Sequence, residues 1–401
     1  MVKDFPNILS DSSKRMKRSA IRELLKLTNK PGLISFAGGL PSPLTFPIEE
    51  LKEITAEVLE NDGTSALQYS TTEGDPLLRK LLTERYAKSG LNITVDNLII
   101  TSSSQQALDL IPKILINPGD KVIVGLPSYL GGLGSFHNYG AKMIGIEFDE
   151  KGMRADKLEE ELEILKKVGD KPKFIYIIPD FQNPAGITMP ESRRKEIIAI
   201  ADKYDVLIVE DSPYRELRFE GQHQKTIYQL ANNGKVILLG TFSKIFVPGF
   251  RIGWIIGDEA IIDKIVMSKQ STDLCTSSFV QKIAAKYIEK GYFDKNLVKI
   301  IDMYREKKNV MMDAFETYLP EGVTWTNPDG GLFLFVSLPK HMDAEELFKV
   351  AVENNVAFVI GSVFHCDESG KNTMRMNFSF ATKEDITEGV KRLAKAIKEM
   401  M

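Results

Sequence analysis

Residues 235–254 read KVILLGTFSKIFVPGFRIGW. The apolar run at 236–239 predicts a buried strand, residues 240–248 predict a turn rich in hydroxyl groups, and residues 249–256 predict a second strand. Lys244 lies in that turn among aromatic and branched aliphatic side chains. Such neighbours exclude water and lower the pKa of an ammonium group, which leaves a nucleophilic amine. The stretch therefore predicts a lysine that can form a Schiff base.

Polar groups stand close to Lys244 in the sequence. Thr241 and Ser243 offer hydroxyls, and Arg251 offers a planar guanidinium suited to a phosphate. Taken alone, these residues also fit a solvated loop lysine beside a structural arginine. The string T-F-S-K followed by P-G-x-R-x-G-W, however, resembles the pyridoxal-phosphate lysine motif of class I aminotransferases of fold type I. This resemblance implies that Lys244 is the catalytic residue and that pyridoxal 5'-phosphate is the cofactor.

The composition of the whole chain favours a globular protein with small-molecule partners. Its 401 residues suggest two or more domains, and 52 basic against 55 acidic residues give no electrostatic case for binding nucleic acid or an anionic membrane. No long apolar run and no signal peptide are found, so neither a membrane span nor secretion is predicted and the cytoplasm is the expected location. Cys275 and Cys366 are too few for a disulfide framework, and no metal site is predicted.

Apolar strand runs alternate with helical segments between about residues 95 and 260, which predicts an α/β architecture with a largely parallel sheet. Residues 126–136, LPSYLGGLGSF, are expected to form a loop that presents a tyrosine. Glu210 and Asp211 would point to opposite faces of the sheet if their strand continues through them. Ligands bind outside the carboxyl ends of the strands in such sheets. The candidate residues all follow predicted strands: Ser104, Tyr129, Asn183, Asp211 and Lys244.

The resembled family assigns a role to each of these positions. By resemblance, Asp211 pairs with the pyridinium nitrogen of the cofactor and Tyr129 stacks on its ring. Asn183 and Tyr214 would bond the phenolate oxygen of the ring. The phosphate would be held by Ser104, Gln105, Thr241 and Arg251 of one subunit and by Tyr69 of its neighbour, which implies a homodimer with shared active sites.

Three segments are expected to contact the substrate, together with Asn183. The string ISFAGGLPSPLTFP at 34–47 resembles the entry segment of the aminoadipate and kynurenine aminotransferase group, and by resemblance Gly39 lies over the substrate. The string S-x-I-R-E-L-L-K resembles one in 2-aminoadipate (LysN-type) enzymes, which implies that Arg22 meets a distal carboxylate, although it could equally face solvent. Arg375 lies on the polar side of an alternating strand; the resemblance makes it the α-carboxylate ligand, and a solvent-facing arginine is the alternative.

The expected fold is therefore α/β, a fold type I pyridoxal-phosphate-dependent transferase with a smaller α+β domain built from antiparallel strands. The expected boundaries are residues 1–45 for an N-terminal arm and part of the small domain, 46–284 for the large cofactor-binding domain, and 285–401 for the small C-terminal domain.

The expected function is transfer of the amino group of an L-amino acid to a 2-oxo acid such as 2-oxoglutarate. The donors expected from the resemblance are 2-aminoadipate and glutamate, with aromatic or branched-chain amino acids also considered. An aromatic-preferring aminotransferase and a lyase are alternatives on the same fold. A non-catalytic regulatory protein that binds the cofactor is an alternative of another class. The intact Lys244, and an N-terminal segment too short for a DNA-binding domain, argue against this last reading.

Overall fold

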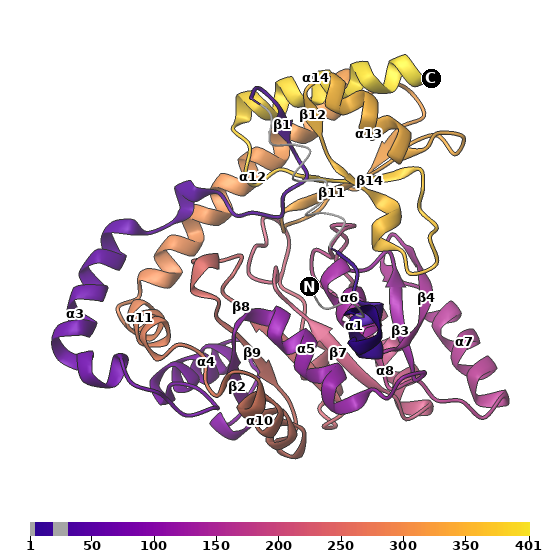
Figure 1. Cartoon of the computed structure of the whole chain (residues 1–401). Helices are drawn as coiled ribbons and strands as arrows, with labels where there is room; N and C mark the ends of the chain where they lie inside the picture. Colours follow the sequence, from indigo (N-terminus) through magenta and orange to yellow (C-terminus); the bar gives the residue numbers. More distant parts are fainter. Residues whose placement is uncertain (1–4, 19–30) are drawn as a thin grey trace.

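The computed structural model describes residues 5–18 and 31–401. Its largest element is an eight-stranded sheet with the order β2-β9-β8-β7-β6-β3-β4-β5 (Figure 1). The strands of this sheet are β2 (Leu98–Thr101), β3 (Lys121–Leu126), β4 (Lys142–Asp149), β5 (Gly152–Met153), β6 (Phe174–Ile177), β7 (Leu207–Asp211), β8 (Val236–Thr241) and β9 (Gly253–Ile256).

Neighbouring strands run parallel through the middle of this sheet, in the order β8-β7-β6-β3-β4. Strand β9 is antiparallel to both β8 and β2, so β2 points the same way as the parallel group, and β5 is antiparallel to β4. The predicted α/β fold with a largely parallel sheet is thus confirmed. The carboxyl ends of β2, β3, β6, β7 and β8 lie along one edge, where the candidate residues follow them.

Apolar strand residues alternate between the two faces of the large sheet, as the two-residue period of a strand requires. Ile175 and Ile208 pack on one face, whose apolar cluster includes residues of α7, α8 and α9. Tyr176 and Val209 pack on the other face, with α5, α6 and α10. These helices are α5 (Ser103–Leu115), α6 (Leu130–Asn138), α7 (Ala155–Lys167), α8 (Glu191–Lys203), α9 (Ile227–Ala231) and α10 (Glu259–Asp273).

The loop expected at 126–136 is wrong in its second half, because α6 begins directly after Tyr129. Leu133 and Phe136 stand one turn apart on this helix and are both buried in the core. Burial of two large apolar side chains on one helix face outweighs the low helix propensity of the three glycines in this helix.

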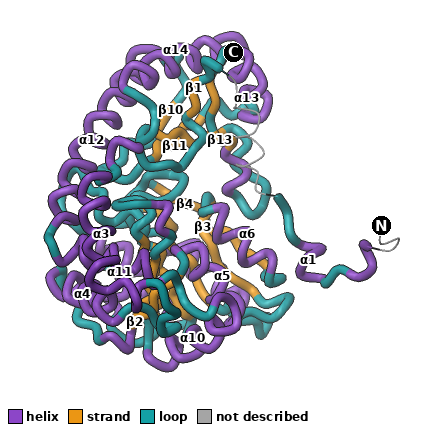
Figure 2. The backbone as a smooth tube through the Cα atoms, turned by 60° about the vertical axis from the view of Figure 1, so that its left-hand side comes forward, coloured by secondary structure: helices purple, strands orange, loops and turns teal. Residues whose placement is uncertain are grey.

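A second sheet is antiparallel, has the order β10-β11-β14-β13, and lies above the large sheet in the view of Figure 2. Strand β1 (Ile34–Ser35) pairs with β12 (Val356–Ala357), so the N-terminal segment joins the C-terminal part of the chain. The domain boundaries remain a prediction. The other elements of this part are β10 (Thr324–Trp325), β11 (Phe333–Ser337), β13 (Val359–Ile360), β14 (Thr373–Asn377), α12 (Tyr292–Tyr318), α13 (Ala344–Glu353) and α14 (Lys383–Met400).

Of the remaining helices, α4 (Pro76–Lys88) lies beside β2 of the large sheet. Helices α3 (Ile48–Ala66), α4 and α11 (Ser278–Glu289) pack together. In the short helix α1 (Asp11–Arg15), Arg15 donates to the carbonyl oxygen of Asn138 at the end of α6, at 3.3 Å, so part of the basic arm is docked. Among the helices of the described residues, none is long and apolar enough to cross a membrane.

Candidate active site

Lys244 lies in the turn that follows β8 and is partly buried, and Phe242 and Phe246, two residues before and after it in the sequence, are fully buried. Its Nζ donates to the carbonyl oxygen of Gly39, at 2.8 Å. Loss of water on burial lowers the pKa of Lys244 to about 8, and the positive charge of Arg375, in addition to that of Arg251, acts in the same direction. The amine is therefore far more often neutral near pH 7 than an ordinary lysine.

A group of hydroxyls and one guanidinium lies between β8, β9 and the N-terminus of α5. Arg251 donates to Oγ of Ser103 and, at 3.3 Å, to Oγ of Ser243. The Thr241 hydroxyl lies 2.9 Å from the Ser243 hydroxyl. Free backbone N–H groups and the helix dipole at the start of α5 also favour an anion at this point. This arrangement is suited to a phosphate group.

The sequence resemblance predicted Ser104 and Gln105 as ligands of the phosphate. In the structure it is Ser103, and not these two residues, that bonds Arg251. Ser103 is buried and bonds Arg251, whereas Ser104 is partly buried in the first turn of α5. Gln105 is exposed and donates to the carbonyl oxygen of Gly131, at 3.3 Å. Its Oε1 accepts from the hydroxyl of Tyr129, at 3.4 Å. Gln105 therefore links α5 to the start of α6.

Asp211 is the last residue of β7 and is buried on the face that carries α5 and α6. Its Oδ2 accepts a hydrogen bond from the hydroxyl of Tyr176, at 2.7 Å. Its Oδ1 has no hydrogen-bond partner among the described residues. Burial raises the pKa of Asp211 to about 7, and the bond from Tyr176 opposes this shift. Glu210 accepts from the backbone N–H of Tyr228, on the opposite face, so the predicted divergence of the two carboxyls is confirmed.

Asn183, Tyr214 and Arg375 form one hydrogen-bonded chain, although they come from three distant segments. Nδ2 of Asn183 donates to the Tyr214 hydroxyl at 3.2 Å, and Oδ1 of Asn183 accepts from Nη1 of Arg375 at 2.9 Å. The loop of Asn183 turns at Gly186, where φ is +72° and where a Cβ would lie 2.7 Å from the Phe333 carbonyl oxygen. Glycine is therefore required for this close approach.

Arg375 is buried in β14 rather than directed at solvent, because both faces of the small sheet are covered at this point. Its guanidinium lies 4.2 Å from the ring centroid of Phe333 and 5.1 Å from that of Phe364. Nη2 donates to the carbonyl oxygen of Ala37, at 2.9 Å, and Nε has no partner among the described residues. Burial lowers the pKa of Arg375 to about 10, which still leaves it charged at neutral pH.

Asp180 connects the loop that carries Asn183 to the loop that carries Tyr214. It is buried and accepts from Arg194 of α8, at 2.7 Å. Arg215 and Arg218, which follow Tyr214, also lie within 3.7 Å and 3.9 Å of its carboxylate. A buried carboxylate shared by several guanidinium groups holds both loops in one position.

Tyr69 makes no contact with this cluster in the described part of the single chain. Tyr69 is 79% exposed in the single chain. Arg22 lies outside the described residues. Tyr129 is the residue directly before α6, next to the segment that bonds Gln105.

The sequence did not single out Ser103, Tyr176 or the carbonyl of Ala37. Ser103 was one of three successive serines, and only its side chain reaches Arg251. Tyr176 lies in an apolar strand, where a tyrosine is usually a core residue, and its position near the end of a strand next to β7 was the available signal.

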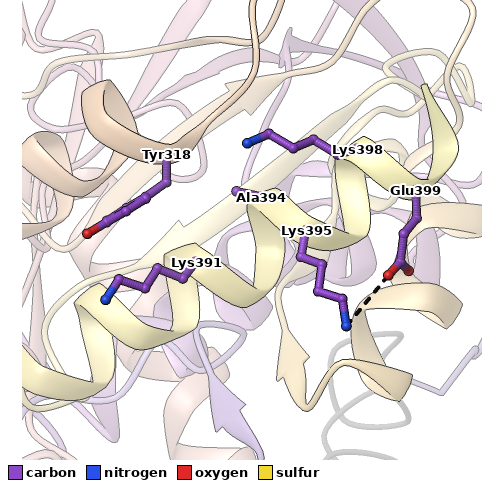
Figure 3. Close-up of a pocket in the computed structure, with 6 residues that line it drawn as sticks. All are labelled: Tyr318, Lys391, Ala394, Lys395, Lys398 and Glu399. Carbon is purple, nitrogen blue, oxygen red and sulfur yellow. Dashed lines mark ion pairs between the residues drawn. The ribbon is translucent and has the colours of Figure 1, made fainter.

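A pocket of about 320 Å³ lies away from this cluster, between the end of α12 and α14 (Figure 3). Its lining includes Tyr318 and three lysines of α14, one of which, Lys395, pairs with Glu399 at 3.7 Å. Lys398 stands in the last turn of α14, where a positive charge interacts favourably with the helix dipole. No cluster of possible metal ligands is found among the described residues.

The cluster at the strand ends fits pyridoxal phosphate. Lys244 offers a partly neutral amine, the unpartnered Oδ1 of Asp211 suits a ring nitrogen, and the group around Arg251 suits a phosphate. The unpartnered Nε of Arg375 suits a carboxylate beside the ring.

Comparison with known proteins agrees with this chemistry. The family model for aminotransferases of class I and II matches residues 34–393. Aromatic-amino-acid aminotransferase 1 of Thermococcus litoralis is 48% identical over 399 residues, which cover 99% of this chain and 96% of the relative. The structure of Pyrococcus horikoshii kynurenine aminotransferase, in complex with PMP and kynurenine, has a TM-score of 0.97 at 46% identity, covering 100% of this chain and 99% of that one.

A third comparison extends the range of substrates among the relatives. LysN, the α-aminoadipate aminotransferase of Thermus thermophilus, was solved with N-(5'-phosphopyridoxyl)-L-leucine and has a TM-score of 0.91 at 37% identity, covering 99% of this chain and 98% of that one. The chain therefore belongs to the class I and II aminotransferases of fold type I, and it is an enzyme that transfers amino groups with pyridoxal phosphate.

Proposed function

We propose that this aminotransferase takes the amino group from aromatic and other apolar L-amino acids and passes it to 2-oxoglutarate. The observation that carries the proposal is the position of Arg375 between Phe333 and Phe364, with Tyr214 edge-on to Phe333 at a centroid distance of 5.8 Å. A carboxylate held by Arg375 would thus lie among aromatic rings, which favour an apolar side chain beside it. The aromatic-amino-acid aminotransferase of Thermococcus litoralis supports the same choice.

A second candidate donor is 2-aminoadipate, with glutamate as its shorter analogue. It is favoured by the string around Arg22, which is similar to that of LysN-type enzymes. The same contact would serve 2-oxoglutarate, because this acceptor also carries a distal carboxylate.

Residues of this chain are proposed to hold the cofactor as follows. Oδ1 of Asp211 would accept from the ring nitrogen, Asn183 and Tyr214 would bond the ring hydroxyl, and Tyr129 would stack on the ring. The phosphate would lie at the N-terminus of α5, held there by Ser103, Ser104, Gln105, Thr241, Ser243 and Arg251. Pyridoxal phosphate, when bound, withdraws electrons from the α-carbon of the attached amino acid, so that its α-proton can leave.

The protein supplies orientation and proton transfer. Arg375 would hold the α-carboxylate with two parallel charge-assisted bonds, which fixes the α-carbon relative to Lys244. Because the pKa of Lys244 is lowered to about 8, its Nζ can take the α-proton as a base and return it as an acid near neutral pH. The Gly39 carbonyl, 2.8 Å from Nζ, would keep the amine on the substrate side of the turn.

The donor range is tested by half-reactions with phenylalanine, leucine, glutamate, 2-aminoadipate and 2-oxoglutarate on the wild type and Arg22→Ala. Phenylalanine is expected to be a good donor of the wild type. Arg22→Ala is expected to weaken the three dicarboxylic substrates by about 10- to 150-fold in kcat/KM, because one charge-assisted bond contributes about 1.5 to 3 kcal/mol. Phenylalanine and leucine should be unchanged.

Arg154→Ala is the matched control, since this arginine pairs with Asp156 at the start of α7, outside the site. Equal losses for acidic and apolar substrates, or none, would show that Arg22 does not meet the distal carboxylate. If kcat/KM of the wild type is at least about 100-fold lower for phenylalanine than for 2-aminoadipate, the aromatic assignment is contradicted. A ratio of this size corresponds to about two charge-assisted bonds.

We also propose a cytoplasmic homodimer in which Tyr69 of each subunit bonds the phosphate bound by the other. Tyr69 is 79% exposed and Leu67 is 72% exposed in the single chain, which is typical of a segment covered by a second subunit. Leu44 is 79% exposed as well. Oγ of Ser278, in α11, donates to the Gln68 carbonyl oxygen at 2.7 Å and holds this segment in place.

Mixed dimers test the shared site. Co-expressed Tyr69→Phe and Lys244→Ala chains with different tags form heterodimers in which one site has both the intact lysine and the intact tyrosine. A random mixture should reach about a quarter of wild-type activity, because half of the dimers have one intact site of two. If Tyr69 instead served its own subunit, every chain with an intact Lys244 would work at the Tyr69→Phe rate. A mixture with no more than half the activity of the Tyr69→Phe homodimer would therefore contradict the exchange of Tyr69.

A further inference from the structure

Tyr176 and Asp211 lie on the same face of two adjacent parallel strands. Tyr176 pairs with Val209 in the register of β6 and β7, and Asp211 stands two residues beyond Val209 on the same side. The Tyr176 side chain bridges this offset, and its hydroxyl donates to Oδ2 of Asp211 at 2.7 Å. Oδ1 of Asp211 is left for another donor.

The Tyr176 ring is fixed by α6. It is 1% exposed, and the ring of Phe136 packs edge-on against it at a centroid distance of 5.2 Å. A Cβ at Gly132 would come within 3.1 Å of the Tyr176 ring, which is closer than most real contacts. Glycine at 132 thus lets the helix approach the ring closely, and the hydroxyl is held toward Asp211.

We propose that Tyr176 is a positioning residue, which orients the Asp211 carboxylate with Oδ1 toward the ring nitrogen of the cofactor and keeps that carboxylate ionised. The inference rests on the proposed role of Asp211 and goes beyond it. A buried carboxyl without a donor favours its neutral form, whereas a hydrogen bond donated to it favours the charged form. Only the charged form makes a strong pair with a protonated ring nitrogen.

Among the described residues, the titratable groups that bear on Asp211 are two tyrosines. Burial raises the pKa of Asp211 to about 7, and the hydrogen bond from Tyr176, in β6, acts against this. Tyr214 lies in the loop after β7. Burial raises the pKa of Tyr214, and the negative charge of Asp211 acts in the same direction. Glu210 points to the opposite face. Burial also raises the pKa of Tyr176 well above its ordinary value, so this hydroxyl stays a donor through neutral and mildly alkaline pH.

The test measures the affinity of the cofactor-free full-length protein for pyridoxamine 5'-phosphate from mildly acidic to mildly alkaline pH. This probe lacks the carbonyl group that would react with Lys244. Tyr176→Phe keeps the ring and removes the hydroxyl, and it is expected to weaken binding by about 10- to 100-fold at neutral pH, as loss of a bond to a charged group does. The pH at which affinity rises should also move up by about one unit or more, because the pKa of Asp211 increases.

Tyr139→Phe is the matched control, since the Tyr139 hydroxyl donates to Asp109 at 3.2 Å, outside the site. It removes the same kind of bond and should change neither the affinity nor the pH midpoint. A Tyr176→Phe protein with wild-type affinity and midpoint would overturn the inference. So would an equal loss of affinity at every pH, because that result would reflect packing alone.

Asp211→Asn separates this inference from the proposed function. It is expected to bind the probe at least as weakly as Tyr176→Phe and to lose the pH dependence that Asp211 causes. If Asp211→Asn binds like the wild type, the role of Asp211 at the ring nitrogen is refuted, and the inference falls with it. If Asp211→Asn is weak while Tyr176→Phe is unchanged, only the role of Tyr176 is refuted.

Discussion

Replacing Lys244 with alanine is expected to lower kcat by more than about 10⁴-fold, because the variant loses both the covalent attachment of the cofactor and the base that moves the α-proton. Cofactor should still bind noncovalently, since the groups around Arg251, Asp211 and Asn183 remain. The measurement is the single-turnover rate with phenylalanine. Borohydride reduction followed by peptide mapping provides a second readout, in which the wild type is labelled at Lys244 and the variant is not.

Lys244→Arg is a suitable companion to this variant. It keeps a positive side chain that can donate to the Gly39 carbonyl, which Lys244 does at 2.8 Å, but it supplies no neutral amine. Both variants should be equally inactive while their folded structure, measured by circular dichroism, is unchanged. A Lys244→Ala enzyme that retains several per cent of the wild-type kcat would contradict the assignment.

Much of this site follows from the periodicity of strands. Once β2, β3, β6, β7 and β8 are recognised as parallel, the residues after them must lie along one edge of the sheet. The two-residue period also predicts that Glu210 and Asp211 face opposite sides of the sheet, as their different hydrogen-bond partners show. Neither inference depends on the details of packing.

Other features depend on backbone and packing details that no periodicity contains. Ser103 bonds Arg251, and its backbone has a φ of +67°, which is a left-handed conformation. The sequence shows three successive serines and does not indicate which of them adopts this conformation. The alternation around Arg375 predicted only that it lies on the polar side of a strand and left a solvent-facing arginine as an alternative. Phe333 and Phe364 lie against its guanidinium. A buried arginine is recognised only when the segments that bury it, which are distant in the sequence, are placed around it.

The burial of Arg375 makes it the second residue with a large expected effect. Arg375→Gln is expected to lower kcat/KM for every amino acid by about 10²- to 10⁴-fold, because two charge-assisted bonds of about 1.5 to 3 kcal/mol each are lost. Glutamine keeps an amide that can donate to Asn183 or to Ala37, which limits the damage to the fold. Phenylethylamine, which has the phenylalanine side chain without a carboxylate, is the control substrate and should react no more slowly than with the wild type.

The same variant should change the titration of Lys244. The positive charge of Arg375 is one of the influences that lower the pKa of Lys244 to about 8, so its removal must raise that pKa. The rate at which cofactor-free protein captures pyridoxal phosphate increases as Lys244 loses its proton, and its midpoint should therefore move to higher pH in Arg375→Gln. Arg154→Gln, outside the site, should leave the midpoint where it is. An unchanged midpoint, together with equal losses for phenylalanine and phenylethylamine, would mean that Arg375 supports the fold rather than the substrate carboxylate.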